Sequence, residues 1–402
     1  MSFSCIQTQT IVAQLVHQCL GYNLLDTFDE YRKPILTREP DQVFNSVSAL
    51  QAQINSRTDH NGAVYQLAGG NYPISTDIRL ENVRNITIYS DPNNRARLDG
   101  QGTANFGVNA KVTDGQNHTN VNTVGFEIVN TRFHGIFYGQ DVISQTAPRG
   151  SLILGNKVHD YATQQGGGIV IRNGRSGELI RVECNEVYNG SLANTGIASG
   201  EGIYIGSGNN EELYTDNVII VGNDLHDLIA EAIDVKRHSK MIFIQHNTID
   251  QINVNSQGAI VLGLDTNGQV QNYNAQMLVA NNVISNVTSR AFNGNFVVVA
   301  VGGVRIFRNV MFNAADHGVA IYNDCDGVEK SVGVIENIIW GYSGLPVQEN
   351  VTSGNNSPDN PCSVERSKNI VMNNAVKDEC AEPASVFQGP LTTFAGFAPR
   401  AV

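Results

Sequence analysis

One short phrase recurs along the chain and constrains its fold more than any other feature. It consists of an asparagine, any residue and an aliphatic residue, often followed by Asp or Asn two places later. Repeats of about 20–50 residues are typical of solenoids, propellers and arrays of small units. The length of 402 residues therefore does not imply two or three separate domains. The phrase begins, at spacings of 29, 38, 24, 35, 27, 28 and 32 residues, at Asn156, Asn185, Asn223, Asn247, Asn282, Asn309, Asn337 and Asn369.

The segments between these asparagines favour one class of repeat. They contain short β-branched runs separated by Gly and Asn, with no helical periodicity. The four-stranded meanders of propeller blades and the regular Leu offsets of leucine-rich repeats are not evident. The sequence therefore predicts an all-β fold, a right-handed parallel β-helix. In this fold the recurring asparagines would lie at a turn where side-chain amides stack.

A second phrase follows most of the asparagines and aligns the coils. Its members have an aliphatic or aromatic residue at the third position, and mostly another at the fifth. We expect them to form one parallel sheet, with one strand per coil and about 4.8 Å between neighbours. The aligned segments are 134–138, 167–171, 201–205, 231–235, 258–262, 290–294 and 317–321.

The chain divides into three parts around this repeat. Residues 1–44 show no clear periodicity and are interpreted as an N-terminal extension. Residues 45–375 form the β-helix, and residues 376–402 form a C-terminal tail. Residues 46–54 suit a short helix capped by Ser46, which would cover the open first coil.

Composition excludes several classes of partner. The net charge of −12 argues against a nucleic-acid binder, which needs a basic face. No run of about 18 apolar residues is present, so we expect no membrane span. Six N-x-S/T sequons favour a secreted, extracellular protein, although residues 11–25 do not read as a signal peptide. We expect a monomer.

Ionisable side chains gather on three adjacent coils of the aligned sheet. Side chains alternate across a strand, so Tyr204, Asp234 and Lys236 should point outward while the aliphatic residues point inward. Glu201 and Glu231 enter neighbouring strands and should lie side by side. Stacked carboxylates repel each other unless a proton or a cation lies between them, and Ca²⁺ prefers such oxygen ligands. Glu201, Glu231 and Asp234 are therefore the predicted calcium ligands.

The neighbouring coils complete a predicted cleft. Arg172 lies two coils from Lys236, and Gly139, Gly206 and Gly263 are expected to leave an open floor around the lysine. The alternative is a solvated ladder of charges in which Lys236 pairs with Asp234 or Glu231.

Three further residues stand where aligned strands begin. Arg290, His317 and His134 are predicted to bind substrate. For the two histidines, a role as simple turn residues is the competing interpretation.

The segment Glu231-Ala-Ile-Asp-Val-Lys236, with Asn247-Thr248 after it, resembles the calcium-dependent polysaccharide lyases of the alginate lyase and chondroitinase B type. Those enzymes are right-handed parallel β-helices. The resemblance implies that Glu231 binds Ca²⁺, that the metal neutralises a uronate carboxylate, and that Lys236 removes the C5 proton. The chain departs from that pattern in two places. Ile229 replaces a second Glu, for which Glu201 would compensate, and Gly263 replaces an Arg.

These observations predict a lyase whose partner is an anionic, uronate-containing polysaccharide. Lys236 would need a pKa below its usual value of about 10.4, which a nearby Ca²⁺ or Arg172 would provide, and Tyr204 would protonate the leaving oxygen. Three alternatives stay open: C5-epimerisation through the same carbanion, hydrolysis by Glu201 and Asp234, and a non-catalytic carbohydrate-binding or adhesive solenoid.

Overall fold

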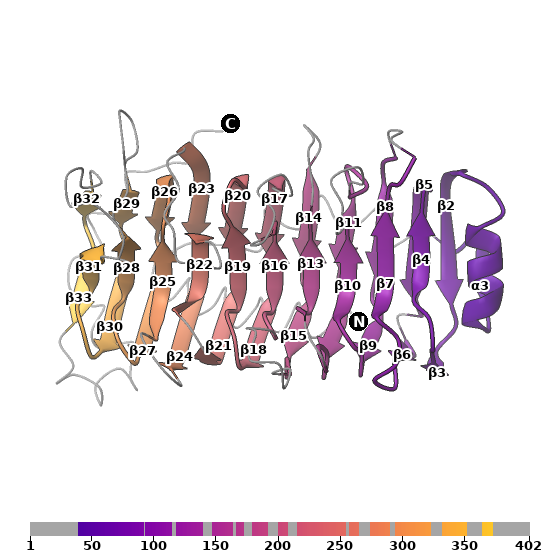
Figure 1. The fold of residues 1–402 in the computed structure, drawn as a ribbon, viewed down its shortest axis with the longest axis horizontal. Helices are drawn as coiled ribbons and strands as arrows, with labels where there is room; N and C mark the ends of the chain where they lie inside the picture. The colour runs from indigo at the N-terminus through magenta and orange to yellow at the C-terminus, as the bar shows by residue number, and fades with distance from the viewer. Residues whose placement is uncertain are drawn as a thin grey trace.

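A computed structural model shows an elongated solenoid of stacked coils, with the N-terminal coils at one end and the C-terminal coils at the other (Figure 1). The structure describes residues 39–372, apart from residue 92 and eleven internal segments. These segments are 115–117, 140–146, 164–165, 173–178, 192–199, 208–214, 255–256, 265–273, 290–293, 323–331 and 352–363.

Three parallel sheets run the length of the solenoid, and within the described residues they contain 12, 11 and 10 strands. Sheet A consists of β1 (Gln42–Phe44), β2 (Asp59–Leu67), β5 (Arg84–Ser90), β8 (Val121–Val124), β11 (Leu152–Leu154), β14 (Ile180–Glu183), β17 (Asp216–Val221), β20 (Lys240–Gln245), β23 (Asn274–Ala280), β26 (Gly302–Phe307), β29 (Val332–Ile335) and β32 (Val364–Ser367). Sheet B consists of β3 (Gly70–Pro73), β6 (Ala96–Asp99), β9 (Glu127–Val129), β12 (Lys157–His159), β15 (Glu186–Tyr188), β18 (Asp224–Leu228), β21 (Thr248–Val254), β24 (Val283–Ser289), β27 (Val310–Ala314), β30 (Ile338–Tyr342) and β33 (Ile370–Met372). Sheet C consists of β4 (Ile78–Glu81), β7 (Phe106–Lys111), β10 (His134–Tyr138), β13 (Ile169–Ile171), β16 (Ile203–Ile205), β19 (Ile233–Lys236), β22 (Gly258–Leu264), β25 (Asn295–Val299), β28 (Val319–Tyr322) and β31 (Val347–Val351).

Each coil passes through the three sheets in the same order, so every third strand along the chain pairs with its predecessor. Connections of this kind between parallel strands are right-handed in nearly all proteins. The predicted fold, a right-handed parallel β-helix, is confirmed. Its interior is a single column of aliphatic side chains, represented by Ile203, Ile205, Ile233 and Val235, each with no exposed surface.

Stacked asparagine amides bind the coils together at the turn before sheet B, as the sequence predicts. The Nδ2 of each asparagine from Asn156 to Asn337 donates a hydrogen bond to the Oδ1 of the asparagine on the next coil, at 2.9–3.1 Å. The same Oδ1 also accepts the backbone N–H of the preceding asparagine, for example from Asn185 to Asn223 at 2.9 Å. We call this row the amide ladder; its members are Asn156, Asn185, Asn223, Asn247, Asn282, Asn309, Asn337 and Asn369.

The N-terminal end of the solenoid is covered by a short helix, α3 (Val47–Ile54), as predicted (Figure 1). Ser46 is its N-cap, and the Ser46 hydroxyl accepts the backbone N–H of Ala49 at 3.2 Å. Leu50 and Ile54 bury the apolar face of the helix against the first coil. Strand β1 precedes the helix, so the described solenoid begins inside the segment expected to be an extension. Among the described residues, no helix is long and apolar enough to cross a membrane.

Sheet C follows the predicted alignment except on one coil. Ile169, Ile203, Ile233 and Ile260 pair in register along β13, β16, β19 and β22. The next strand was predicted at 290–294, and this is wrong. Strand β25 begins at Asn295, and Val297 takes the place expected for Phe292. The β-branched run Val297-Val298-Val299 suits a strand better than Phe292-Asn293-Gly294, which only resembles the repeat.

Candidate active site

Two glutamates occupy equivalent positions on adjacent coils of sheet C. Glu201 and Glu231 each lie two residues before a paired isoleucine, Ile203 or Ile233, and so share one column along the sheet. Asp234 lies on β19 and pairs with Tyr204 on β16. This placement agrees with the expected outward direction of these side chains. We call Glu201, Glu231 and Asp234 the carboxylate cluster.

The three carboxylates are buried and close together. One oxygen from each lies within 4.8 Å of the others, and the residues are 6%, 6% and 1% exposed. Burial, followed by the charges of Glu231 and Asp234, raises the pKa of Glu201 to about 8 against the opposing effect of Lys236. Burial raises the pKa of Asp234 to about 6, although Lys236 opposes the shift. A proton therefore remains on the cluster at neutral pH when no cation is bound.

Lys236 lies at the end of β19 and contacts the cluster directly. Its Nζ is 2.5 Å from Oδ2 of Asp234, and its side chain is 13% exposed. Burial alone would lower the pKa of Lys236, but Asp234, Tyr204 and Glu231 outweigh burial and raise it. The expected low pKa is therefore wrong for the protein without a bound cation, because Asp234 holds the ammonium in its charged form.

Tyr204 lies between two cations. The Nζ of Lys236 and the Cζ of Arg172 are each 5.4 Å from the centre of its ring. Arg172 also lies 5.7 Å from the ring of Phe137 on the coil before it. Burial raises the pKa of Tyr204 above its usual value, so its hydroxyl keeps a proton. The structure thus brings Arg172, Tyr204 and Lys236 together beside the cluster.

The predicted open floor of glycines is wrong. A Cβ at Gly139 would collide with the Arg172 carbonyl, and one at Gly263 would collide with the Val301 side chain. Gly139, Gly206 and Gly263 have φ angles of +120°, +85° and +79°, which explains why glycine occupies these turns. A register shift after Val235 also pairs Lys236 with Leu264 rather than Gly263.

The two histidines predicted to bind substrate share the column of Glu201 and Glu231 but lie outside the cluster. His134 precedes Glu201 by two coils, and its Nδ1 accepts the backbone N–H of Gly167 at 3.0 Å. Burial and the charge of Arg172 lower the pKa of His134 well below its usual value. In the same way, Nδ1 of His317 accepts the backbone N–H of Leu345 at 2.8 Å. Both imidazoles therefore tie one coil to the next.

The third residue predicted to bind substrate, Arg290, lies outside the described residues. Its expected place in the column is taken by Asn295, which the sequence alignment missed because of the misplaced strand. The Asn295 Oδ1 accepts the backbone N–H of His317 at 3.0 Å, which is again a contact between coils. The run Val297-Val298-Val299 was the feature of the sequence that could have located this strand.

The carboxylate cluster fits a divalent cation. Ca²⁺ lies about 2.3–2.6 Å from its oxygen ligands, so ligands on opposite sides are up to about 5 Å apart. The 4.8 Å limit on the separation of the three oxygens matches this spacing. Within the described part of the chain, Oδ1 of Asp234 is buried and has no hydrogen-bond partner. A hard cation would satisfy that oxygen.

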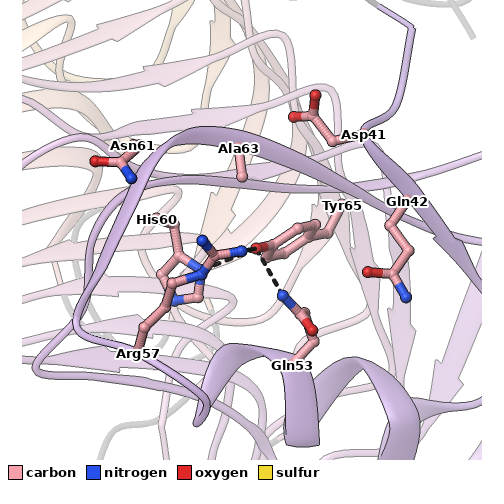
Figure 2. Close-up of a pocket in the computed structure, with 8 residues that line it drawn as sticks. All are labelled: Asp41, Gln42, Gln53, Arg57, His60, Asn61, Ala63 and Tyr65. Atoms are coloured by element: carbon pink, nitrogen blue, oxygen red, sulfur yellow. Dashed lines mark hydrogen bonds between the residues drawn. The ribbon is translucent and has the colours of Figure 1, made fainter.

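A separate pocket of about 290 Å³ lies at the N-terminal end, between the first coil and α3 (Figure 2). The Tyr65 hydroxyl is at its centre, 3.0 Å from each of Gln53 Nε2, Arg57 Nη2 and His60 Nδ1. The other ring nitrogen of His60 lies 3.1 Å from the Ile54 carbonyl, so it carries the proton and Nδ1 accepts from Tyr65. These bonds attach the capping helix to the solenoid.

The chain matches no protein-family model and no curated protein. Among solved structures it is similar to an alginate lyase from Paenibacillus sp., with 14% identity over 76% of this chain and 98% of that one (TM-score 0.42). It is also similar to a GH87 α-1,3-glucanase from Streptomyces thermodiastaticus, with 12% identity over 83% of this chain and 68% of that one (TM-score 0.46). A third similar structure is PfbA, a surface adhesin of Streptococcus pneumoniae, with 11% identity over 82% of this chain and 88% of that one (TM-score 0.42). None of these similarities bears on the chemistry of the site, which rests on this chain's own residues.

Proposed function

We propose that this protein is a polysaccharide lyase that cleaves a uronate-containing polymer by metal-assisted β-elimination. One observation carries the proposal. Three buried carboxylates from adjacent coils bring their oxygens within 4.8 Å of one another, beside Lys236 and Tyr204. A cation, a base and an acid are the three elements that elimination from a uronate requires.

Glu201, Glu231 and Asp234 would hold the cation, and Ca²⁺ is the candidate that suits an all-oxygen ligand set. A Ca²⁺ held there would neutralise the uronate carboxylate and would stabilise the negative charge that develops when the C5 proton is lost. This charge stabilisation is the largest single contribution that the site could make to the rate.

Lys236 is the proposed base. In the structure Asp234 keeps it protonated, through the 2.5 Å contact between Nζ and Oδ2. Positive charge bound at the cluster would oppose the effect of Asp234 and lower the pKa of Lys236, because like charges disfavour the ammonium form. The neutral amine can then accept the C5 proton. The protonated hydroxyl of Tyr204 is adjacent and can donate to the leaving oxygen.

Hydrolysis is the second candidate, and one observation favours it. The pKa of Glu201 is raised to about 8, which makes this residue a protonated acid at neutral pH beside the other two carboxylates. A spacing of up to 4.8 Å is closer to the roughly 5–5.5 Å of retaining glycosidases than to the 6.5–9.5 Å of inverting ones. The reaction product separates the two candidates.

The test is to incubate the protein with a panel of uronate polymers and Ca²⁺, following ultraviolet absorbance for unsaturated ends and chromatography for chain length. Elimination gives unsaturated, shortened chains. Shortening without unsaturation would indicate hydrolysis, altered uronate stereochemistry would indicate epimerisation, and binding without conversion would indicate a non-catalytic role.

A lysine substitution tests the assigned base. Lys236→Ala should lower the turnover rate by about 10²–10⁴-fold, since a proton-transfer group typically contributes that much. Lys240→Ala is the matched control, because Lys240 is exposed and begins β20 on sheet A. A Lys236→Ala variant as fast as the Lys240→Ala variant would remove Lys236 from the mechanism.

A further inference from the structure

A buried phenol touches the backbone of the carboxylate cluster from inside the solenoid. Tyr161 follows β12, outside the recurring asparagine phrase, and has no exposed surface. Its hydroxyl donates to the carbonyl oxygen of Glu201 at 2.9 Å and lies 3.2 Å from that of Gly200. The proposed base and acid act from outside sheet C, whereas Tyr161 reaches a cluster residue from the core.

Two glycines leave room for this phenol. A Cβ at Gly168 would lie 3.1 Å from Cζ of Tyr161, and a Cβ at Gly190 would lie 2.7 Å from its hydroxyl oxygen. The Cβ at Gly190 would also collide with the Gly200 carbonyl. The space occupied by the Tyr161 hydroxyl therefore exists only because both neighbours lack side chains.

The backbone that leads into Glu201 is held from several directions. The Glu201 carbonyl accepts the backbone N–H of Gly168 at 2.8 Å, in addition to the Tyr161 hydroxyl. Gly200, with φ +97°, donates its backbone N–H to the carbonyl of Gly166 at 2.7 Å. The Gly200 and Glu201 carbonyls, both contacted by the Tyr161 hydroxyl, belong to the two peptide groups that flank the Glu201 Cα. Fixing these two peptide groups fixes the direction of the Cα–Cβ bond of Glu201, and hence the side of the cluster that its carboxylate reaches.

We infer that Tyr161 is a positioning residue for the cation site: its hydroxyl holds the Glu201 backbone so that the Glu201 carboxylate converges with Glu231 and Asp234. This inference rests on the proposed function, because it assumes that the cluster binds a cation. Residues that orient metal ligands commonly change metal affinity about 10–100-fold when they are removed. The effect of Tyr161 acts through the backbone, so the lower end of that range applies.

The test compares two buried tyrosines by Ca²⁺ calorimetry on the full chain, with thermal unfolding measured alongside. Tyr161→Phe removes only the hydroxyl. Tyr138→Phe is the control, because Tyr138 is equally buried and its hydroxyl contacts Thr123 Oγ1 at 2.9 Å and the Val121 carbonyl at 3.0 Å, away from the cluster. Both variants should lose similar stability. We expect about 10-fold weaker Ca²⁺ binding for Tyr161→Phe and wild-type binding for Tyr138→Phe.

Gly190→Ala tests the same contact without changing Tyr161, so the inference does not depend on the folding of Tyr161→Phe alone. Gly190→Ala keeps the Tyr161 hydroxyl but displaces it and the Gly200 carbonyl, so it should also weaken Ca²⁺ binding. If Tyr161→Phe and Gly190→Ala both bind Ca²⁺ as tightly as the wild type does, the positioning role is overturned and the proposed function stands. If both tyrosine variants weaken binding equally, the effect is general loss of stability and the inference fails. A wild type that binds no Ca²⁺ overturns the inference together with the metal site.

Discussion

The amide ladder and the carboxylate cluster both arise from stacking like side chains on successive coils, but only the ladder satisfies its own hydrogen bonds. In both, the solenoid places like side chains at equivalent positions on successive coils. The ladder stacks eight asparagines along the interior turn, each bonded to the next at 2.9–3.1 Å. The cluster stacks Glu201 and Glu231, with Asp234 beside them.

The difference follows from the hydrogen-bonding capacity of the two groups. An amide carries both donors and an acceptor, so a column of amides satisfies itself. An ionised carboxylate only accepts, so stacked carboxylates require a proton, a lysine or a metal between them. The ladder therefore stabilises the fold by itself, whereas the cluster is complete only with a positively charged partner. A repeat can place a reactive site simply by changing the residue that it stacks.

Breaking the ladder at its centre should have the largest effect. Asn223→Ala removes the acceptor for the N–H and Nδ2 of Asn185 and the donor to Oδ1 of Asn247 and to the Val182 carbonyl. These groups are buried, so we expect a loss of about 3 kcal/mol in the free energy of unfolding. Urea denaturation measures this. Asn369→Ala, at the last described rung, should cost about 1 kcal/mol, and equal losses at the two positions would contradict the account.

Replacing a carboxylate of the cluster by an amide should raise the free energy of unfolding, whereas breaking the amide ladder lowers it. Glu201 titrates at about 8 in the folded protein against an ordinary value of 4.5, so its contribution to stability is full below pH 4.5 and is lost as the pH rises through 8. With a chelator present, Glu201→Gln should therefore become progressively more stable relative to wild type as the pH rises across this window. Unfolding curves at several pH values measure the difference, and a constant offset would refute it.

The outer face of sheet B provides a third kind of stack, in which the rings of His159, Tyr188 and His226 lie on one another, beside Glu127 and Glu186. His226 stacks on Tyr188 at 4.8 Å, and Glu186, followed by Asp227 against the effect of burial, raises its pKa to about 9. The stabilisation is full below pH 6.5 and is lost as the pH rises through 9. Because His226 is only half-buried, His226→Gln should cost less than about 1 kcal/mol at pH 6 and nothing at pH 10. A cost that persists at pH 10 would assign the effect to packing.

Much of this fold could be predicted from the sequence, because a repeat displays its own register. The alternating Ile203, Ile205, Ile233 and Val235 suffice to place Glu201 and Glu231 side by side. The prediction was wrong where the coils were irregular. The shift after Val235 depends on local backbone geometry that a pattern of residue types does not encode, whereas the strand misplaced at 290–294 was marked by the valine run after Asn295.

The pKa shifts of the site residues were harder to predict than which residues form the site. The sequence indicated that Lys236 pairs with an acid or acts as a base, but the sign of its pKa shift depends on the 2.5 Å contact with Asp234. Tyr161 could not be recognised, because its partner is a backbone carbonyl and its space depends on Gly168 and Gly190, which lie on other segments of the coils.

The central claim is that the carboxylate cluster holds either a proton or a cation. The most direct test is Ca²⁺ calorimetry at pH 7 in buffers of different ionisation enthalpy, which counts the protons released on binding. Because Glu201 titrates at about 8, Ca²⁺ binding should release about one proton more from the wild type than from Glu201→Gln, and any proton lost by Lys236 is common to both proteins. Binding without proton release, or no binding at all, would contradict the account.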